Sequence, residues 1–541
     1  MGVAKKPPCG AVPARVALAM LTSAGVVMLY VLRINMSVAI VAMVKPIPLR
    51  PSPDDATGNA SAPLTAPTPY CIAATPSSAP VNVTVEAEVW SRDAHNGTEP
   101  GSAEPDDGSY QLSLTGTEKG MVLGAFFYGY FATNIPGGRL AEEYGTKKVF
   151  GGSILISGVL TLLTPVAARV HYVLLILLRA LIGLVNGVVY PAMNVMVSRW
   201  IPPLERPRFM SFTYMSNTLG TIITLPVCAV VADTMGWPAV FYISGAASLV
   251  WVAAWALLMH DCPSEHPRIS QEEKRYILDA ISKGTTKNKP RRTPWKAIIC
   301  SVPLWATTTA HIGSMFGFNL LLTQLPSYMD SILGFSITSN GLLSALPFLS
   351  QFLGSTGSGV LGDWLLTKGY LTVHTSRRLF NTTSLLLPGI ILVVVGYAGC
   401  NTALAVALLC LGSGFSGGIC SGHLANHLDL SPNFSGTILG LSNTLAYMVS
   451  MCVPVIVGAM TPGQTLQEWQ TVFWMTGVMY TVTWLVFLAF SSTEIQSWNY
   501  GEDHQVEKKR KPDGGDANGE GVQDVEEKKL FLSSNGKPQI V

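Results

Sequence analysis

The chain has 541 residues, of which 48% are hydrophobic and only 13% are charged, and its formal net charge is +2. Soluble domains usually carry about 25% charged residues, so this composition excludes an ordinary soluble protein of the same length. The basic residues recur in short clusters between apolar stretches rather than in one patch, which argues against a nucleic-acid partner. The nine cysteines are scattered without metal-ligand spacing, and we expect neither a metal site nor a bound cofactor.

Apolar stretches long enough to cross a lipid bilayer recur along most of the chain. The first is too long for the hydrophobic segment of a signal peptide, so we expect it to remain as a membrane span. The pattern predicts an all-α membrane protein with about twelve transmembrane helices, near residues 16–44, 117–137, 149–168, 171–197, 209–233, 237–259, 302–328, 338–362, 379–399, 403–426, 435–461 and 470–491.

The basic residues between these stretches indicate the topology. Most fall on one side of the membrane if the amino terminus is cytoplasmic, which predicts an even number of spans with both termini in the cytoplasm. The predicted organisation is a cytoplasmic amino terminus (1–15), a six-helix half (16–259), a cytoplasmic central loop (260–301), a second six-helix half (302–491) and a disordered cytoplasmic tail (492–541).

A long polar loop, 45–116, is placed by this topology on the extracellular or luminal side. It contains three N-glycosylation sequons, at Asn59, Asn82 and Asn96, and we expect all three to be modified. Cys71 lies in this loop, and Cys400 is the other cysteine expected on the same, oxidising side. A disulfide between Cys71 and Cys400 is therefore predicted.

Two short segments match each other, each in the loop that follows the second span of its half. The first contains Gly138, Glu142, Gly145, Lys147 and Lys148, and the second contains Gly359 and Asp363. Glycine lets two helices approach closely, and an acid facing basic residues and helix ends can latch two halves together. This repeated pattern resembles the loop motif of the major facilitator superfamily, which implies two six-helix halves alternating around a midplane site and a gating role for these residues.

Further segments resemble one family within that superfamily. They are residues 32–40, 124–130, 135–138, 200–206, 325–329, 426–429 and 468–473. These segments are similar to the anion transporters that include sialin, the vesicular glutamate and nucleotide transporters and the sodium–phosphate cotransporters. The resemblance implies transport of a small anion, such as sialate, an acidic amino acid or inorganic phosphate.

Two arginines lie within predicted spans, Arg33 and Arg179. An arginine at the centre of a span costs about 2.5–3.5 kcal/mol on insertion scales, and neither span contains an acid to neutralise it. A guanidinium can bind a carboxylate or phosphate bidentately, so both are candidate anion ligands, with a structural role as the alternative. The other candidate substrate-binding residues are Asn35, Tyr128, Asn186, Asn194, His311 and Asn319.

The fourth span departs from the proton-coupled relatives. Where those relatives commonly have glutamates this chain has Ile182 and Asn186, and Asn194 stands where they commonly have a histidine. None of these side chains titrates, whereas asparagine oxygens can coordinate sodium. We therefore expect coupling to sodium or to the membrane potential rather than to protons, with His311 as the remaining titratable candidate. His423 and His427 are interpreted as structural or gating residues.

Several alternatives stay open. The chain could be a sensor that binds an anion without moving it, or a proton-coupled, sialin-like lysosomal exporter. An enzyme is not expected, because no catalytic triad, paired acids or phosphate-binding loop is present. Leu123 and Ser314 replace a histidine and an arginine of the glutamate branch, which argues against glutamate. We expect a monomer in the plasma membrane or an endolysosomal or vesicle membrane.

Overall fold

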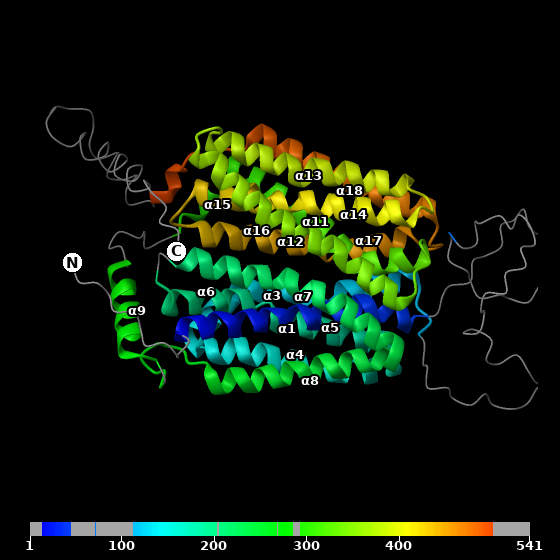
Figure 1. Ribbon diagram of the computed structural model, residues 1–541, viewed down its shortest axis with the longest axis horizontal. Coiled ribbons are helices and arrows are strands. Elements are labelled where there is room, and N and C mark those ends of the chain that lie inside the picture. The colour runs from blue at the N-terminus through cyan, green and yellow to red at the C-terminus, as the bar shows by residue number, and fades with distance from the viewer. Residues whose placement is uncertain are drawn as a thin grey trace, which may run out of the picture.

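The computed structural model describes residues 13–44, 71, 112–202, 205–267, 269–284 and 293–500. In this part of the chain the secondary structure is helical, apart from one isolated bridge between Val44 and Leu112. The long helices run side by side along the longest dimension of the molecule (Figure 1). This is the arrangement expected of a membrane bundle, in which every backbone polar group must be satisfied within its own helix.

The first half of the bundle contains six rods. They are α1 (Ala14–Met43), α3 (Gly116–Tyr144), α4 (Thr146–Val170), α5 (Tyr172–Asn186) continued by α6 (Val189–Trp200), α7 (Arg206–Met235) and α8 (Trp237–Leu258). The connection to the second half holds α9 (Gln271–Gly284) and α10 (Trp295–Ile299).

The second half repeats the pattern with two interrupted rods. It consists of α11 (Val302–Ser331), α12 (Ile337–Thr367), α13 (Val373–Tyr397), α14 (Thr402–Ser416) with η2 (Gly417–Cys420) and α15 (His423–Leu430), α16 (Ser435–Ser450) with α17 (Val453–Met460), and α18 (Leu466–Phe490); the short η3 (Ser497–Tyr500) follows. The two halves lie beside each other in Figure 1, with the blue-to-green rods below the yellow-to-orange ones.

Nine helical stretches in the described part of the chain are long and apolar enough to cross a membrane. Three further rods, α3, α11 and α12, have 29, 30 and 31 residues but are more polar. These three contact the opposite half: α3 packs on α16 and α17, α11 on α1, and α12 on α7. Their polar residues are therefore explained by a position between the halves rather than against lipid. The twelve helices expected from the sequence are confirmed, and their predicted positions differ from the observed ones mainly at the ends.

One end of the bundle is held by charged contacts around Arg15 and is called the Arg15 end. Arg15 Nη1 lies 2.7 Å from a carboxylate oxygen of Glu205 at the start of α7. The Glu273 carboxylate of α9 accepts hydrogen bonds from the backbone N–H groups of Ala14 and Arg15 at 3.0 and 3.2 Å. These contacts anchor α9 across the ends of α1 and α7, which is also where Figure 1 shows it.

The opposite end carries a disulfide between Cys71 and Cys400 and is called the disulfide end. The Cα atoms of the two cysteines are 5.3 Å apart, within the range that a disulfide requires. The backbone N–H of Cys71 also donates to the carbonyl of Ile332 at 3.2 Å. The predicted glycosylation sites Asn59, Asn82 and Asn96 lie outside the described residues.

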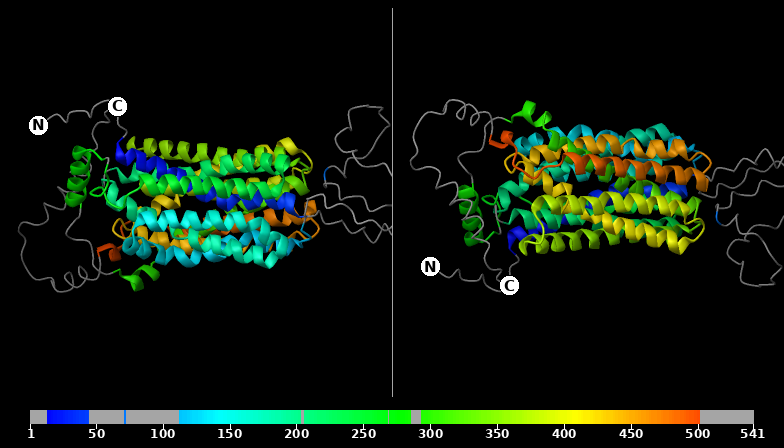
Figure 2. Two further views of the ribbon diagram at one scale, coloured as in Figure 1. Left: turned by 90° about the horizontal axis from the view of Figure 1, so that it is seen from below. Right: turned by 90° about the horizontal axis from the view of Figure 1, so that it is seen from above.

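Glycines bring the two halves together at the disulfide end. A Cβ added to Gly116 of α3 would lie 2.6 Å from the carbonyl oxygen of Gly458 on α17, and one added to Gly341 of α12 would lie 2.7 Å from that of Leu225 on α7. Both distances are shorter than a real Cβ contact, so only glycine permits these helix–helix approaches. The halves are thus closely packed at this end. Both views of Figure 2 show the long helices running parallel to the length of the bundle.

Candidate functional site

Arg33 lies on α1 at the contact between the two halves. Its side chain is buried, with the residue 5% exposed, and its Nη2 donates to the Asn319 Oδ1 of α11 at 2.9 Å. Asn319 is held in turn, because its Nδ2 donates to Ser450 Oγ of α16 at 2.9 Å. The first helix of each half therefore contributes one residue to a hydrogen bond that joins the halves near the middle of both helices.

Four aromatic rings surround the Arg33 guanidinium. Its Cζ lies 5.2 Å from the ring centroid of Tyr30, 5.2 Å from that of Phe126, 4.9 Å from that of Phe127 and 5.7 Å from that of Tyr447. Cations interact favourably with aromatic faces at this range. Within the described residues Arg33 forms no ion pair, so the rings are its available partners for charge, and an anion would be a stronger one.

Arg179 occupies a different position from Arg33. It is 2% exposed, and it donates to the carbonyl oxygens of Leu32 at 3.0 Å and Arg33 at 2.7 Å. It also donates to Asn35 Oδ1 at 3.3 Å. The guanidinium of Arg179 thus holds the α1 backbone at the residue that carries the first arginine. These contacts agree with the structural alternative for Arg179, and its direct contact with an anion stays a prediction.

A small cavity separates the two arginines. It measures about 10 Å³ and is lined by both arginines together with Ser37, Leu123 and Thr323 and apolar neighbours. This volume is about the minimum for one ordered water. The Nε atoms of Arg33 and Arg179 are buried without a hydrogen-bond partner, so each arginine retains donor capacity. A carboxylate or phosphate needs more room, and the halves must separate to admit it.

The other polar candidates of the first half mainly connect its helices. Asn35 Nδ2 donates to Ser244 Oγ at 3.1 Å, and the Asn186 Oδ1 accepts from the hydroxyls of Ser153 and Ser157 at 3.2 and 2.9 Å. Ile182 is fully buried on the same helix as Arg179. Of the remaining candidates, Tyr128 is half-buried and Asn194 is exposed.

The first loop motif forms the turn between α3 and α4. Gly145 has φ +89°, a left-handed conformation that favours glycine. The Lys147 N–H donates to the Asp261 Oδ1 at 2.7 Å, whereas Glu142 pairs only with exposed Arg139 at 3.4 Å. An added Cβ at Gly138 would have ordinary contact with Pro191. Asp261, which follows α8, was not predicted; an isolated acid in a loop gives no sequence signal for such a contact.

The second loop motif is arranged differently. An added Cβ at Gly359 would meet no atom within 4 Å, and no ion pair of Asp363 occurs in the described segments. The ion pair at this end of the second half is instead Arg377 Nε with Asp429 Oδ2 at 2.7 Å. Lys148 has no hydrogen bond among the side-chain contacts of the described residues, so its gating role stays a prediction.

Two six-helix halves packed side by side with a buried cationic site between them are the architecture of a secondary transporter. Residues 101–454 match the family model described as Major Facilitator Superfamily. A solved D-xylose–proton symporter has the same fold, with a TM-score of 0.60 at 12% identity, covering 89% of this chain and 100% of that one. The match and the fold exclude an enzyme as the interpretation of this chain.

Curated relatives identify the family more closely. Sialin of Homo sapiens is 38% identical over 91% of this chain and 92% of its own length. A putative inorganic phosphate cotransporter of Drosophila melanogaster is 35% identical (88% and 84%), and vesicular glutamate transporter 2 of Homo sapiens is 36% identical (72% and 67%). The chain belongs to the anion transporter family of the major facilitator superfamily.

Proposed function

We propose that this protein is a secondary active transporter that moves a small anion by alternating access, with Arg33 as the residue that binds the anion's negative group. The observation that carries the proposal is the buried guanidinium between the halves, which is enclosed by aromatic rings and has no acid paired to it among the residues that the structure describes. Carboxylate and phosphate are the groups that arginine binds bidentately. Sialate, an acidic amino acid and inorganic phosphate are the candidate substrates.

The Arg33–Asn319 hydrogen bond suggests how binding is linked to movement. It joins the two halves at 2.9 Å, and an anion that engages Arg33 competes with the Asn319 oxygen for the same donor. A ligand shifts a conformational equilibrium only through unequal affinity for the two states. An anion that replaces this inter-half bond therefore favours a rearranged state, while the close glycine contacts at the disulfide end must open for access from that side.

The driving ion stays a prediction. The sequence favours sodium or the membrane potential, because Ile182 and Asn186 cannot titrate. Two asparagines near the arginines already use their amide oxygens, since Asn35 Oδ1 accepts from Arg179 and Asn186 Oδ1 accepts from two serines. The geometry of the first half thus gives sodium less support than its sequence does, and a proton is the competing candidate.

Uptake by proteoliposomes tests the proposal. The full-length protein would be reconstituted and offered labelled sialate, acidic amino acids and phosphate, with sodium, proton and potential gradients imposed separately. Arg33→Ala should abolish uptake, and Arg169→Ala, which removes an exposed arginine at the end of α4, should leave it unchanged. Anion binding without uptake under any gradient would favour the sensor alternative, and wild-type uptake by the Arg33 variant would remove the proposed binding residue.

The proposed location is a membrane of the plasma or endolysosomal and vesicular system, with both termini in the cytoplasm. Under that topology the Arg15 end faces the cytoplasm and the disulfide end faces the oxidising side. Protease protection of a carboxy-terminal tag in sealed vesicles tests this orientation: a tag shielded on the luminal side would reverse it.

A further inference from the structure

The second half of the bundle contains three buried histidines in close contact, here called the histidine cluster: His311 on α11 and His423 and His427 on α15. They are 1%, 0% and 1% exposed. The ring centroid of His311 lies 5.6 Å from that of His423 and 5.9 Å from that of His427. His311 precedes Asn319 by eight positions, which is about 12 Å along a helix, so the cluster is separate from the arginine site.

The hydrogen bonds of His427 define which of its nitrogens is basic. Its Nδ1 lies 2.9 Å from the backbone carbonyl oxygen of His423, and a carbonyl can only accept, so Nδ1 carries the hydrogen. Its Nε2 lies 2.9 Å from Ser442 Oγ, which in turn lies 2.8 Å from Thr308 Oγ1. Hydroxyls both donate and accept. Nε2 can therefore accept from Ser442 when neutral and donate to it after taking up a proton.

His423 has the same type of environment. Its Nδ1 lies 2.8 Å from Asn381 Oδ1, and its Nε2 lies 3.2 Å from Ser314 Oγ. The Ser314 hydroxyl also reaches the carbonyl of His311 at 2.9 Å. When that hydroxyl donates to the carbonyl, its oxygen is left to accept a hydrogen from Nε2. A ring that donates from both nitrogens is a protonated one, and these partners accommodate it.

One ring nitrogen of His311 lacks a hydrogen-bond partner, which is an observation independent of the two other rings. Its Nδ1 is buried without a hydrogen-bond partner. Leaving a buried polar atom unpaired costs about 1–3 kcal/mol, so a water that hydrogen-bonds to this nitrogen would be stabilised there. It sits between two rings that can exchange hydrogens with hydroxyls.

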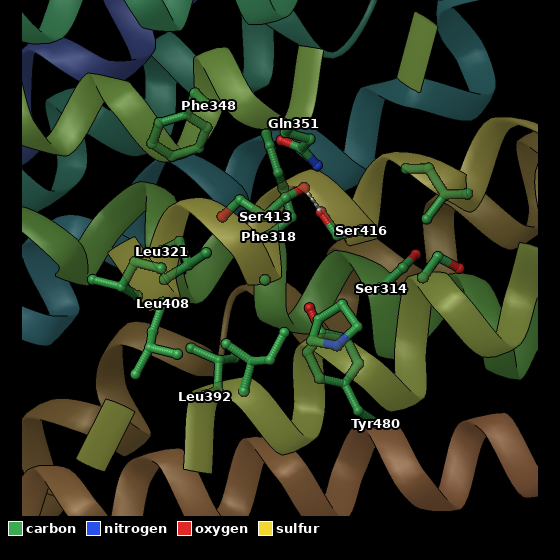
Figure 3. A pocket seen from close by; sticks show the side chains of 16 residues that line it. Ser314, Phe318, Leu321, Phe348, Gln351, Leu392, Leu408, Ser413, Ser416 and Tyr480 are labelled. Atoms are coloured by element: carbon green, nitrogen blue, oxygen red, sulfur yellow. Dashed lines mark hydrogen bonds between the residues drawn. The ribbon is translucent and has the colours of Figure 1, made fainter. Parts of the chain in front are cut away.

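A pocket next to the cluster has polar side chains on one side and is large enough to hold water. It measures about 30 Å³, room for about two waters, and Ser314 is one of its lining residues. Figure 3 shows Gln351, Ser413 and Ser416 gathered on one side of it and Leu392 and Leu408 on another. The Ser413 hydroxyl is buried without a partner. Ser314 therefore connects a space suited to water with the Nε2 of His423.

Within the described residues, the hydrogen-bond partners of the cluster are uncharged. Of the elements packed around it, α12 and α13 contribute Gln351 and Asn381, α16 contributes Ser442, and α18 contributes Tyr480, a titratable phenol that lines the pocket. Among the charged groups of α13 and α15, Arg377 and Asp429 are paired with each other, and Arg378 is the remaining charged residue of α13. The tenth rod is also interrupted between α14 and α15, just before His423, and interrupted helices are where transporters commonly place ion sites.

We propose that the histidine cluster is the proton-binding site of the transport cycle. One proton passes from a hydronium ion in the pocket to a ring Nε2, leaving water and an imidazolium, and it passes from the imidazolium to water on the other side of the membrane. Imidazole is the side chain that ordinarily changes charge near neutral pH. The cluster thereby supplies, in the second half, the titratable group that the fourth span lacks. This inference rests on the proposed anion transport.

Proteoliposomes that report anion uptake and internal pH together test the inference. In the wild type, anion uptake should carry protons and should increase several-fold when the source side is acidified. His427→Gln and His311→Asn should lose both the proton movement and the pH dependence, yet retain exchange of labelled for unlabelled anion, which needs no net proton transfer. His171→Asn, which replaces an exposed histidine at the start of α5, is the matched control and should behave as wild type.

The outcomes distinguish failure of the proton site from failure of the proposed anion transport. Wild-type anion uptake that moves no protons, or cluster variants with the wild-type pH profile, would overturn the proton site and leave the transporter. Absence of both uptake and exchange for every anion would instead overturn the proposed function. If the histidine variants fail to fold, Ser442→Ala tests the site instead, because it removes the hydroxyl next to His427 Nε2 and keeps all three rings. Slower proton movement in this variant would support the site, and unaltered proton movement would contradict it.

Discussion

Replacing the two buried arginines with alanine should give two different defects. Arg33→Ala removes the guanidinium that the proposal assigns to the anion, together with its hydrogen bond to Asn319. Arg179→Ala removes three hydrogen bonds to α1, two of them to main-chain carbonyls. We expect the first variant to be stable and unable to bind anions, and the second to be less stable as well as inactive.

The sizes of the two effects follow from these contacts. A hydrogen bond to a charged group contributes about 1.5–3 kcal/mol net. The three bonds of Arg179 are not additive, because its carbonyl partners keep their helical bonds, and a loss of about 3–4 kcal/mol is a reasonable total. The bond of Arg33 to Asn319 predicts a loss of about 1.5–3 kcal/mol, partly recovered because removing Arg33 also eliminates a buried charge without an acid partner.

Thermal unfolding in detergent and equilibrium anion binding measure the two defects separately. Arg179→Ala should unfold at a clearly lower temperature than Arg33→Ala, and a saturating anion should raise the unfolding temperature of the wild type but not of the Arg33 variant. Arg179→Lys is a useful companion, since it keeps the charge but cannot reach several carbonyls at once.

A different pattern of stability and affinity would contradict the positioning role of Arg179. If Arg179→Ala unfolds at the wild-type temperature and has lost only anion affinity, then Arg179 contacts the substrate and its bonds to α1 contribute little. The positioning role assigned to it would then be wrong, and the cavity between the arginines would be the anion site itself.

Three further outcomes are expected. Gly183→Leu should prevent correct folding, judged by gel filtration, because any side chain there overlaps the Phe126 carbonyl where α5 crosses α3; a monodisperse, active variant would contradict the observed packing. Tyr447→Ala should weaken anion binding about 2–30-fold, the size of one cation–π contact with Arg33, whereas Tyr447→Phe, which keeps the ring, should weaken it less. Cys400→Ser should lower the unfolding temperature under oxidising conditions only, and an equal difference from wild type in reductant would show that the loss is not that of the disulfide.

Helix positions were largely predictable because hydrophobic stretches of spanning length are a strong local signal. The rods α3 and α11 were recognised although they are less apolar, since they retain spanning length between polar turns. The position of Arg33 within a span was predictable for the same reason, because a charged residue inside an apolar stretch can be recognised from the sequence alone. The anion transporter family, expected from several short segments, is confirmed by the relatives.

The partners of those residues were harder to predict. The distinct roles of Arg33 and Arg179 depend on which of them faces α1 and which faces α11, and neither direction is visible from spacing alone. Tyr447 lies more than 400 positions after Arg33 in the sequence, and nothing local marks it as part of the aromatic enclosure. The histidine cluster could not be predicted, because His311 lies on α11 whereas His423 and His427 lie on α15, and only the fold brings these helices together.

The disulfide between Cys71 and Cys400 has a consequence for how the molecule can be divided. Cys71 belongs to the connection between the first two rods of the first half, whereas Cys400 lies between α13 and α14 of the second. The two halves are therefore joined twice along the covalent structure, once through the α9 connection and once through sulfur. A protease that cuts between α8 and α11 would yield two fragments that migrate as one species until a reductant separates them. The halves could also be produced as separate chains and linked covalently on assembly.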